Sequence, residues 1–119
     1  MDRSIADWLS IRMTVTQDAL FRTLADPTRR AIFERLCREG EQTVGALTAE
    51  AGISQPAVSK HLRVLKQAGL ARDRHQGRQT HYRAEVRALS LLIDWTSEMK
   101  SFWERRFDGL EDLLKRMDQ

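Results

Sequence analysis

Three consecutive segments of the chain each start at a helix-capping residue and stop at a glycine. They run from Asp26 to Gly40, from Thr43 to Gly52 and from Ser54 to Gly69. In the first segment Pro27 follows the cap, where its missing amide hydrogen costs nothing because first-turn amides lack helical partners. This punctuation predicts three helices, with a tight turn between the last two, and so a helix–turn–helix arrangement.

Apolar residues recur at helical spacing inside these segments. The predicted inward side chains are Ala31, Ile32 and Leu36, then Val44, Leu47 and Ala51, then Val58, Leu62 and Leu65. An earlier segment, from about Thr16 to Leu24, places Leu20, Phe21 and Leu24 on one face. A weaker repeat from about Ser4 to Arg12 marks residues 1–15 as an accessory arm, or the twelve leading residues as sequence ahead of a start at Met13.

The pattern changes after Leu70. Short extended runs at 71–75 and 79–84, joined across residues 76–78, predict a β-hairpin. A seam of apolar residues with steps of three and four then predicts one helix from about Val86 to Met117. At 1.5 Å per residue this helix is about 45 Å long, more than so small a core can cover, so its apolar stripe needs a partner. We expect one mainly α domain with a small β-hairpin over residues 1–119, which dimerises.

Charge is concentrated in one quarter of the chain. Residues 54–83 hold seven Lys or Arg and a single acidic residue, Asp73, whereas the flanking regions are close to neutral. Such a cluster suits a polyanion such as nucleic acid.

The segment from Ser54 to about Ala68 concentrates this charge on one face. Taken as a helix, it places Lys60, Arg63 and Gln67 opposite the apolar stripe, with no acidic residue anywhere. Arg, Lys and Gln are the side chains that pair with guanine and adenine edges in the major groove, and free amides at a helix start bind phosphate. The predicted DNA contacts on this helix are Ser54, Gln55, Ser59, Lys60 and Arg63.

The hairpin adds two arginines, Arg74 and Arg78, near Gly77. Arginine enters minor grooves or clamps the adjacent backbone. We expect both to contact DNA and to affect affinity more than sequence specificity.

Three stretches together resemble the arsenic-repressor (ArsR) family: LADPTRRAIFERL, GISQPAVSKHLRVLKQAGL and GRQTHYR, in that order. The resemblance implies a winged helix-turn-helix fold and a bacterial-type cytoplasmic repressor. It also implies dimerisation through the N- and C-terminal helices, a recognition helix over about 54–68, a wing over about 71–84 and a dimerisation helix over about 86–117.

The chain departs from the family where many members bind metals. The stretch TVGALTA, before the recognition helix, has no thiol, and the last helix pairs Asp94 and Glu98 with no histidine. The lone Cys37 cannot form a cysteine pair within the chain, and we expect it to face the core. We therefore expect no metal and no cofactor.

Other chemistry has weaker support. His61 is expected to pack or to contact phosphate, and no arrangement of nucleophile, base and acid indicates an enzyme. The aromatic cluster Trp95, Phe102, Trp103 and Phe107 fits a dimer interface better than a ligand pocket.

The sequence thus predicts a homodimeric regulator of double-stranded DNA, most simply a repressor at a pseudo-palindromic operator. The alternative is a winged-helix adaptor that binds proteins. The absence of a membrane-length apolar run or a signal peptide predicts a cytoplasmic location with no membrane contact. The operator, the effector and the choice between repression and activation stay open.

Overall fold

The computed structural model describes residues 15–118. The chain divides after Leu89 into two compact units: helices α2 to α5 with a small sheet, and then the single helix α6. The segment expected from Ser4 to Arg12 lies outside the described residues. The expectation of one domain over residues 1–119 stays a prediction.

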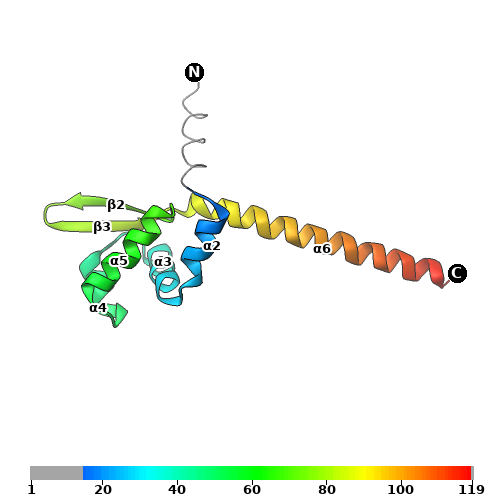
Figure 1. Cartoon of the computed structure of the whole chain (residues 1–119), viewed down its shortest axis with the longest axis horizontal. Helices are drawn as coiled ribbons and strands as arrows, with labels where there is room; N and C mark the ends of the chain where they lie inside the picture. The colour runs from blue at the N-terminus through cyan, green and yellow to red at the C-terminus, as the bar shows by residue number, and fades with distance from the viewer. Residues whose placement is uncertain (1–14, 119) are drawn as a thin grey trace, which may run out of the picture. The chain divides into compact units, whose positions relative to one another are not determined.

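Helices α2 and α3, labelled in Figure 1, each start at a side-chain cap. Helix α2 (Gln17–Ala25) follows Thr16, whose hydroxyl accepts a hydrogen bond from the Ala19 amide at 3.1 Å. Helix α3 (Pro27–Glu39) follows Asp26, whose Oδ2 accepts from the Arg29 amide at 2.8 Å. These caps confirm the predicted helix starts.

The next two helices form the expected helix–turn–helix. Helix α4 (Val44–Ala51) is capped by Thr43, and helix α5 (Gln55–Gln67) by Ser54. Between them Gly52 adopts φ 70°, a left-handed conformation that costs glycine least. The predicted turn is therefore confirmed.

The hairpin belongs to a three-stranded antiparallel sheet. Strands β2 (Ala71–Gln76) and β3 (Gln79–Ala84) pair along their length, with Gly77 at φ 63° in the turn. A third strand, β1 (Gln42–Thr43), pairs with β3 opposite Tyr82 and His81. The prediction missed β1, because two residues are too few to display an alternating pattern.

The core draws one or more fully buried side chains from each of the four helices and from the start of the hairpin. The largest of these fully buried side chains are Leu20, Leu36, Leu47, Val58, Leu62, Leu65 and Leu70. The stripe predicted for α5 is confirmed, since Val58, Leu62 and Leu65 are each 0% exposed.

The inward assignment of Ala31 was wrong, and the face predicted for helix α2 is only partly buried. In α3 Phe33 is buried and Ala31 is exposed, because at 100° per residue Ala31 lies about 140° from Leu36 and Phe33 only about 60°. In α2 Leu20 is buried, whereas Phe21 is 42% exposed.

Helix α6 (Ser90–Met117) forms the second unit. A 3₁₀ turn (Val86–Leu89) occupies the start of the single helix predicted over 86–117. None of the side chains of α6 is buried. The apolar residues of α6 are therefore not buried within this unit.

Candidate nucleic-acid interface

Helix α5 separates an apolar face from a basic one, as its sequence predicts. Lys60, Arg63, Lys66 and Gln67 are exposed, while the opposite stripe is fully buried. The helix contains no acidic residue, so no negative charge of its own opposes the basic side chains of its exposed face.

The hydroxyl of Ser54 is engaged in holding the start of α5. Its Oγ accepts a hydrogen bond from the Ala57 amide at 3.3 Å. A phosphate at this end would therefore meet the remaining first-turn amides rather than a free hydroxyl.

The start of α5 and the end of the wing border a common hollow of about 310 Å³. Three predicted contacts, Gln55, Ser59 and Arg78, line it. The other lining residues are Thr43, Val44, Gly45, Gln79 and Thr80. Sequence reasoning missed this second group, because their small or polar side chains carry no charge signal and only the fold brings them to α5.

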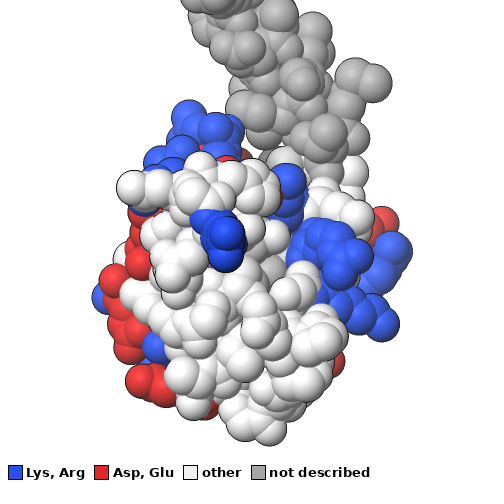
Figure 2. All heavy atoms as spheres, turned by 90° about the vertical axis from the view of Figure 1, so that its left-hand side faces the viewer, with Lys and Arg blue, Asp and Glu red and all other residues white. Residues whose placement is uncertain are grey.

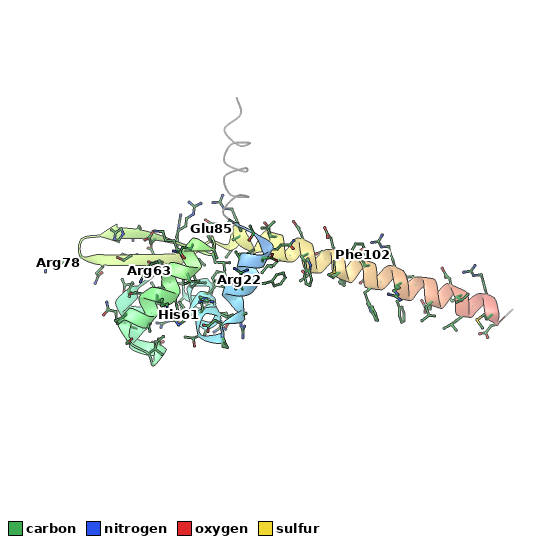
Figure 3. All side chains as sticks on the ribbon, in the orientation of Figure 1. Arg22, His61, Arg63, Arg78, Glu85 and Phe102 are labelled. Atoms are coloured by element: carbon green, nitrogen blue, oxygen red, sulfur yellow. The ribbon has the colours of Figure 1, made fainter. Side chains whose placement is uncertain are left out.

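Free positive charge is distributed unevenly over the seven basic residues of 54–83. Acidic partners hold Lys66, Arg72 and Arg74. Lys60, Arg63, Arg78 and Arg83 form no ion pair with any residue in 15–118. Figure 3 shows Arg63 on α5 and Arg78 at the end of the hairpin. Unpaired guanidinium and ammonium groups keep their full charge for phosphates and base edges.

The surface at the wing end is correspondingly polarised. Figure 2, which faces this end, shows Lys and Arg on both flanks of the molecule, with Asp and Glu gathered mainly on the left flank. Among residues 54–83, which include α5 and the hairpin, Asp73 is the only acidic residue.

Arg74 is placed differently from the other predicted contacts. Its Nε lies 2.7 Å from Oε1 of Glu41 and its Nη2 lies 2.9 Å from Oε2, a bidentate pair. This pairing raises the pKa of Arg74 and lowers that of Glu41 below its usual range. The side chain does not line the hollow that contains Arg78.

His61 packs inside the fold. Its Nδ1 is buried without a hydrogen bond and lies 3.9 Å from Oδ2 of Asp26, at the start of α3. Of the two roles expected for His61, this geometry favours packing.

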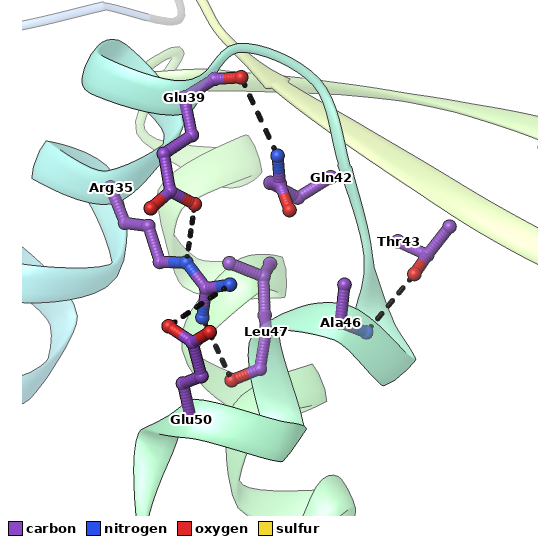
Figure 4. A network of polar contacts seen from close by, with 7 residues as sticks. All are labelled: Arg35, Glu39, Gln42, Thr43, Ala46, Leu47 and Glu50. Atoms are coloured by element: carbon purple, nitrogen blue, oxygen red, sulfur yellow. Dashed lines mark hydrogen bonds and ion pairs between the residues drawn. The ribbon is translucent and has the colours of Figure 1, made fainter.

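Arg35 holds α4 against α3 (Figure 4). Its Nε donates to Glu39 at 2.8 Å, its Nη2 lies 3.4 Å from Glu50, and its Nη1 donates to the Leu47 carbonyl at 3.5 Å. The first helix of the helix–turn–helix is thereby fixed to the preceding helix.

Cys37 does not face the core, so that prediction was wrong. The residue is exposed, because at 100° per residue it is rotated about 100° from the buried Leu36. Partial desolvation of the thiol and the nearby Glu34 carboxylate raise its pKa, which keeps it protonated and weakly nucleophilic at neutral pH.

Neither a metal site nor a membrane span is found in the described part of the chain. No group of three or more His, Cys, Asp or Glu side chains within residues 15–118 could hold a metal ion. None of the helices there has the length and apolar character needed to cross a bilayer.

Helix α6 carries a broad exposed apolar stripe. Trp103 is 69% exposed and Phe107 55%, and both border a shallow hollow of about 440 Å³ beside Gly109. The guanidinium of Arg105 lies 4.8 Å from the centre of the Phe102 ring. This much exposed aromatic surface is typical of a protein–protein interface.

The sequence matches known DNA-binding proteins. A helix-turn-helix domain family matches residues 24–74. The HTH-type transcriptional regulator Rv2034 of Mycobacterium tuberculosis is 40% identical over 97 residues, which are 82% of this chain and 87% of that protein. Transcriptional repressor SdpR of Bacillus subtilis is 36% identical over 76 residues, 64% of this chain and 83% of the repressor.

Solved structures agree. The ArsR family transcriptional regulator RHA00566 superposes with a TM-score of 0.68 at 34% identity, covering 73% of this chain and 89% of that one. The homodimeric winged helix-turn-helix domain Mb0332 of Mycobacterium bovis gives a TM-score of 0.57 at 25% identity, covering 82% and 87%. These relatives give no support to a protein–protein adaptor.

Proposed function

Because this chain belongs to the ArsR family of winged helix-turn-helix transcriptional regulators, we propose that it represses transcription by binding a pseudo-palindromic operator as a homodimer. The observation that carries the proposal is the unpaired positive charge of α5 and the wing end, gathered around one acid-free helix face.

We assign base reading to α5. Gln55, Ser59, Lys60 and Arg63 would face the major groove, with the amides after Ser54 on a phosphate. Arg78, which borders the same hollow as Gln55, would enter the neighbouring minor groove or hold its backbone. Two recognition helices of a dimer would meet half-sites about 34 Å apart, one turn of DNA.

The apolar stripe of α6 supports the dimer. A second copy of this chain would cover Trp103 and Phe107, and the homodimeric state of Mb0332 agrees with this assembly. The family and fold are those of DNA-binding regulators, so we propose no catalytic activity and a cytoplasmic location, where the operator is.

Fluorescence anisotropy on DNA from upstream of the gene and on scrambled DNA, over a salt titration, tests the function. Nanomolar binding to the upstream DNA that falls steeply with salt is expected. Weak, equal binding to both DNAs would contradict sequence-specific recognition at that site.

Two variants separate the assigned roles. Arg63→Ala should weaken operator binding by about 1 to 3 kcal/mol and relax specificity at one base pair. Arg78→Ala should weaken binding to all DNA and reduce the salt slope by about one. Arg38→Ala, which removes an exposed charge from α3, is the control and should leave affinity unchanged.

A further inference from the structure

Two consecutive residues of β2 each form an ion pair with another part of the fold, on opposite faces of the sheet. Side chains alternate along a strand, so Asp73 and Arg74 point to opposite sides. On one side Asp73 accepts from Lys66 Nζ of α5, with N–O distances of 3.0 and 3.1 Å. On the other, Arg74 forms its bidentate pair with Glu41, one residue before β1. We call Glu41, Lys66, Asp73 and Arg74 the two-sided clamp.

The clamp lies at the point where the hairpin extends beyond its pairing with β1. Strand β1 pairs with β3 only as far as His81. Beyond the clamp, no hydrogen bond or ion pair joins residues 75–80 to a described element outside the hairpin. Within the hairpin they are held by the β2–β3 ladder, by a 3.1 Å contact between His75 and Thr80, and by the clamp residues themselves. Arg74 Nη1 donates to Oε1 of Gln76 at 2.8 Å, and His75 Nε2 lies 3.9 Å from Oδ2 of Asp73. A two-stranded hairpin alone is marginally stable, so its direction depends on its last attachment.

Glu41 and Asp73, the two acids of the clamp, lie among basic residues, where a negative charge weakens electrostatic attraction to DNA. Asp73 is the only acidic residue in 54–83, and Glu41 lies close enough to Arg74, His81 and Arg83 for their charges to lower its pKa. Each carboxylate cancels charge that would otherwise attract phosphate. Both pairs reach solvent through their basic partners Lys66 and Arg74, and ion pairs that reach solvent add little to stability, so a purely structural gain does not account for them.

We propose that Glu41 and Asp73 are positioning residues for DNA binding, which hold the wing so that Arg78 stays beside Gln55 and Ser59. Arg74 then orients the wing instead of contacting phosphate. This inference rests on the proposed function, because the wing has to meet DNA for its direction to matter.

The sign of the effect on affinity provides the test. Removing an acid near DNA strengthens binding if electrostatic attraction alone matters. The clamp predicts the opposite: Glu41→Gln and Asp73→Asn should each weaken operator binding about fivefold or more, with the salt slope unchanged. Glu34→Gln, which removes a carboxylate paired with Arg38 on α3, is the matched control and should not weaken binding.

A charge exchange separates positioning from contact. The double variant Glu41→Arg with Arg74→Glu restores an ion pair at the same place and should recover most of the wild-type affinity. If Arg74 contacts phosphate, the exchange will bind as weakly as Arg74→Ala and Glu41→Gln will bind more tightly, and the proposal is overturned.

A measurement without DNA tests whether the clamp holds the wing, independently of the proposed function. Backbone ¹⁵N relaxation order parameters of residues 75–80 should fall in Glu41→Gln and Asp73→Asn and stay at wild-type values in Glu34→Gln, all with thermal unfolding midpoints close to wild type. Unchanged order parameters in both clamp variants would overturn the proposal. Wild-type protein that binds no DNA would instead overturn the proposed function, while the order parameters still decide whether the clamp holds the wing.

Discussion

Helices α5 and α6 are both amphipathic, but only α5 finds its apolar partners within one unit of the chain. Leu62 of α5 is 0% exposed, whereas Trp103 of α6 is 69% exposed. Helix α5 is short and lies against α3, α4 and β2, so folding buries its stripe and leaves the charged face for DNA. Helix α6 has 28 residues and buries none of them. The difference shows that the same periodic pattern serves folding in one helix and, as we propose, assembly in the other.

The largest expected effect is in the core face of α5. Leu62→Ala should lower the free energy of unfolding by about 3 kcal/mol, because a fully buried leucine leaves a cavity when truncated. Urea denaturation measures the loss. A loss below about 1 kcal/mol would mean that α5 is not buried in this way, and the contrast with α6 would fail.

Truncation in α6 should affect assembly instead. Trp103→Ala should weaken dimerisation by about 2 kcal/mol, roughly thirtyfold in the dissociation constant, as for a central aromatic residue of an interface. Sedimentation equilibrium over a range of concentrations measures it. Asp112→Ala is the control, since Asp112 is turned about 180° from Trp103 on the same helix. Equal effects of the two variants would contradict a dimer interface on the apolar stripe.

Substitutions of Ser54 test how much its capping hydrogen bond contributes to the stability of the fold. Ser54→Ala removes the acceptor of the Ala57 amide and should cost about 1 kcal/mol of unfolding free energy. Ser54→Asp, which keeps an acceptor, should retain wild-type stability in thermal melts. A loss as large with Asp as with Ala would mean that the cap is not what Ser54 supplies.

The smallest effect distinguishes a free helix from a packed one. Apart from the backbone of its own helix and its two chain neighbours, no described atom lies within 4 Å of the place where a Cβ of Gly109 in α6 would lie. Gly109→Ala should therefore stabilise α6 by up to about 1 kcal/mol through helix propensity. Circular dichroism melts at low protein concentration measure this gain. A weaker dimer in the same variant would show that a second copy packs closely against Gly109.

The sequence predicted most of the elements because their determinants are local. A capping side chain and the amide it binds are three residues apart, as in Asp26 with Arg29 and Ser54 with Ala57. A glycine with positive φ, such as Gly52, marks a turn by itself. The buried stripe of α5 followed from helical spacing alone.

Two errors arose from the face assigned to α3. At 100° per residue from Leu36, the spacing itself places Phe33 inward and turns Ala31 and Cys37 away, so these errors lay in how the pattern was interpreted. Of the predicted DNA contacts, Gln55, Ser59 and Arg78 meet at one hollow, but Arg74 pairs elsewhere. Charge alone identifies a basic residue without telling which acid reaches it.

Sequence alone therefore determined the boundaries of α2 to α5, the hairpin, the acid-free basic face of α5 and the surplus apolar stripe of α6, because each depends on residues within a few turns of one another. Only the tertiary structure decided the pairing of β1 with β3 and the ion pair between Glu41 and Arg74, 33 positions apart. Such contacts form when the folded core brings distant segments together, and no local pattern records them.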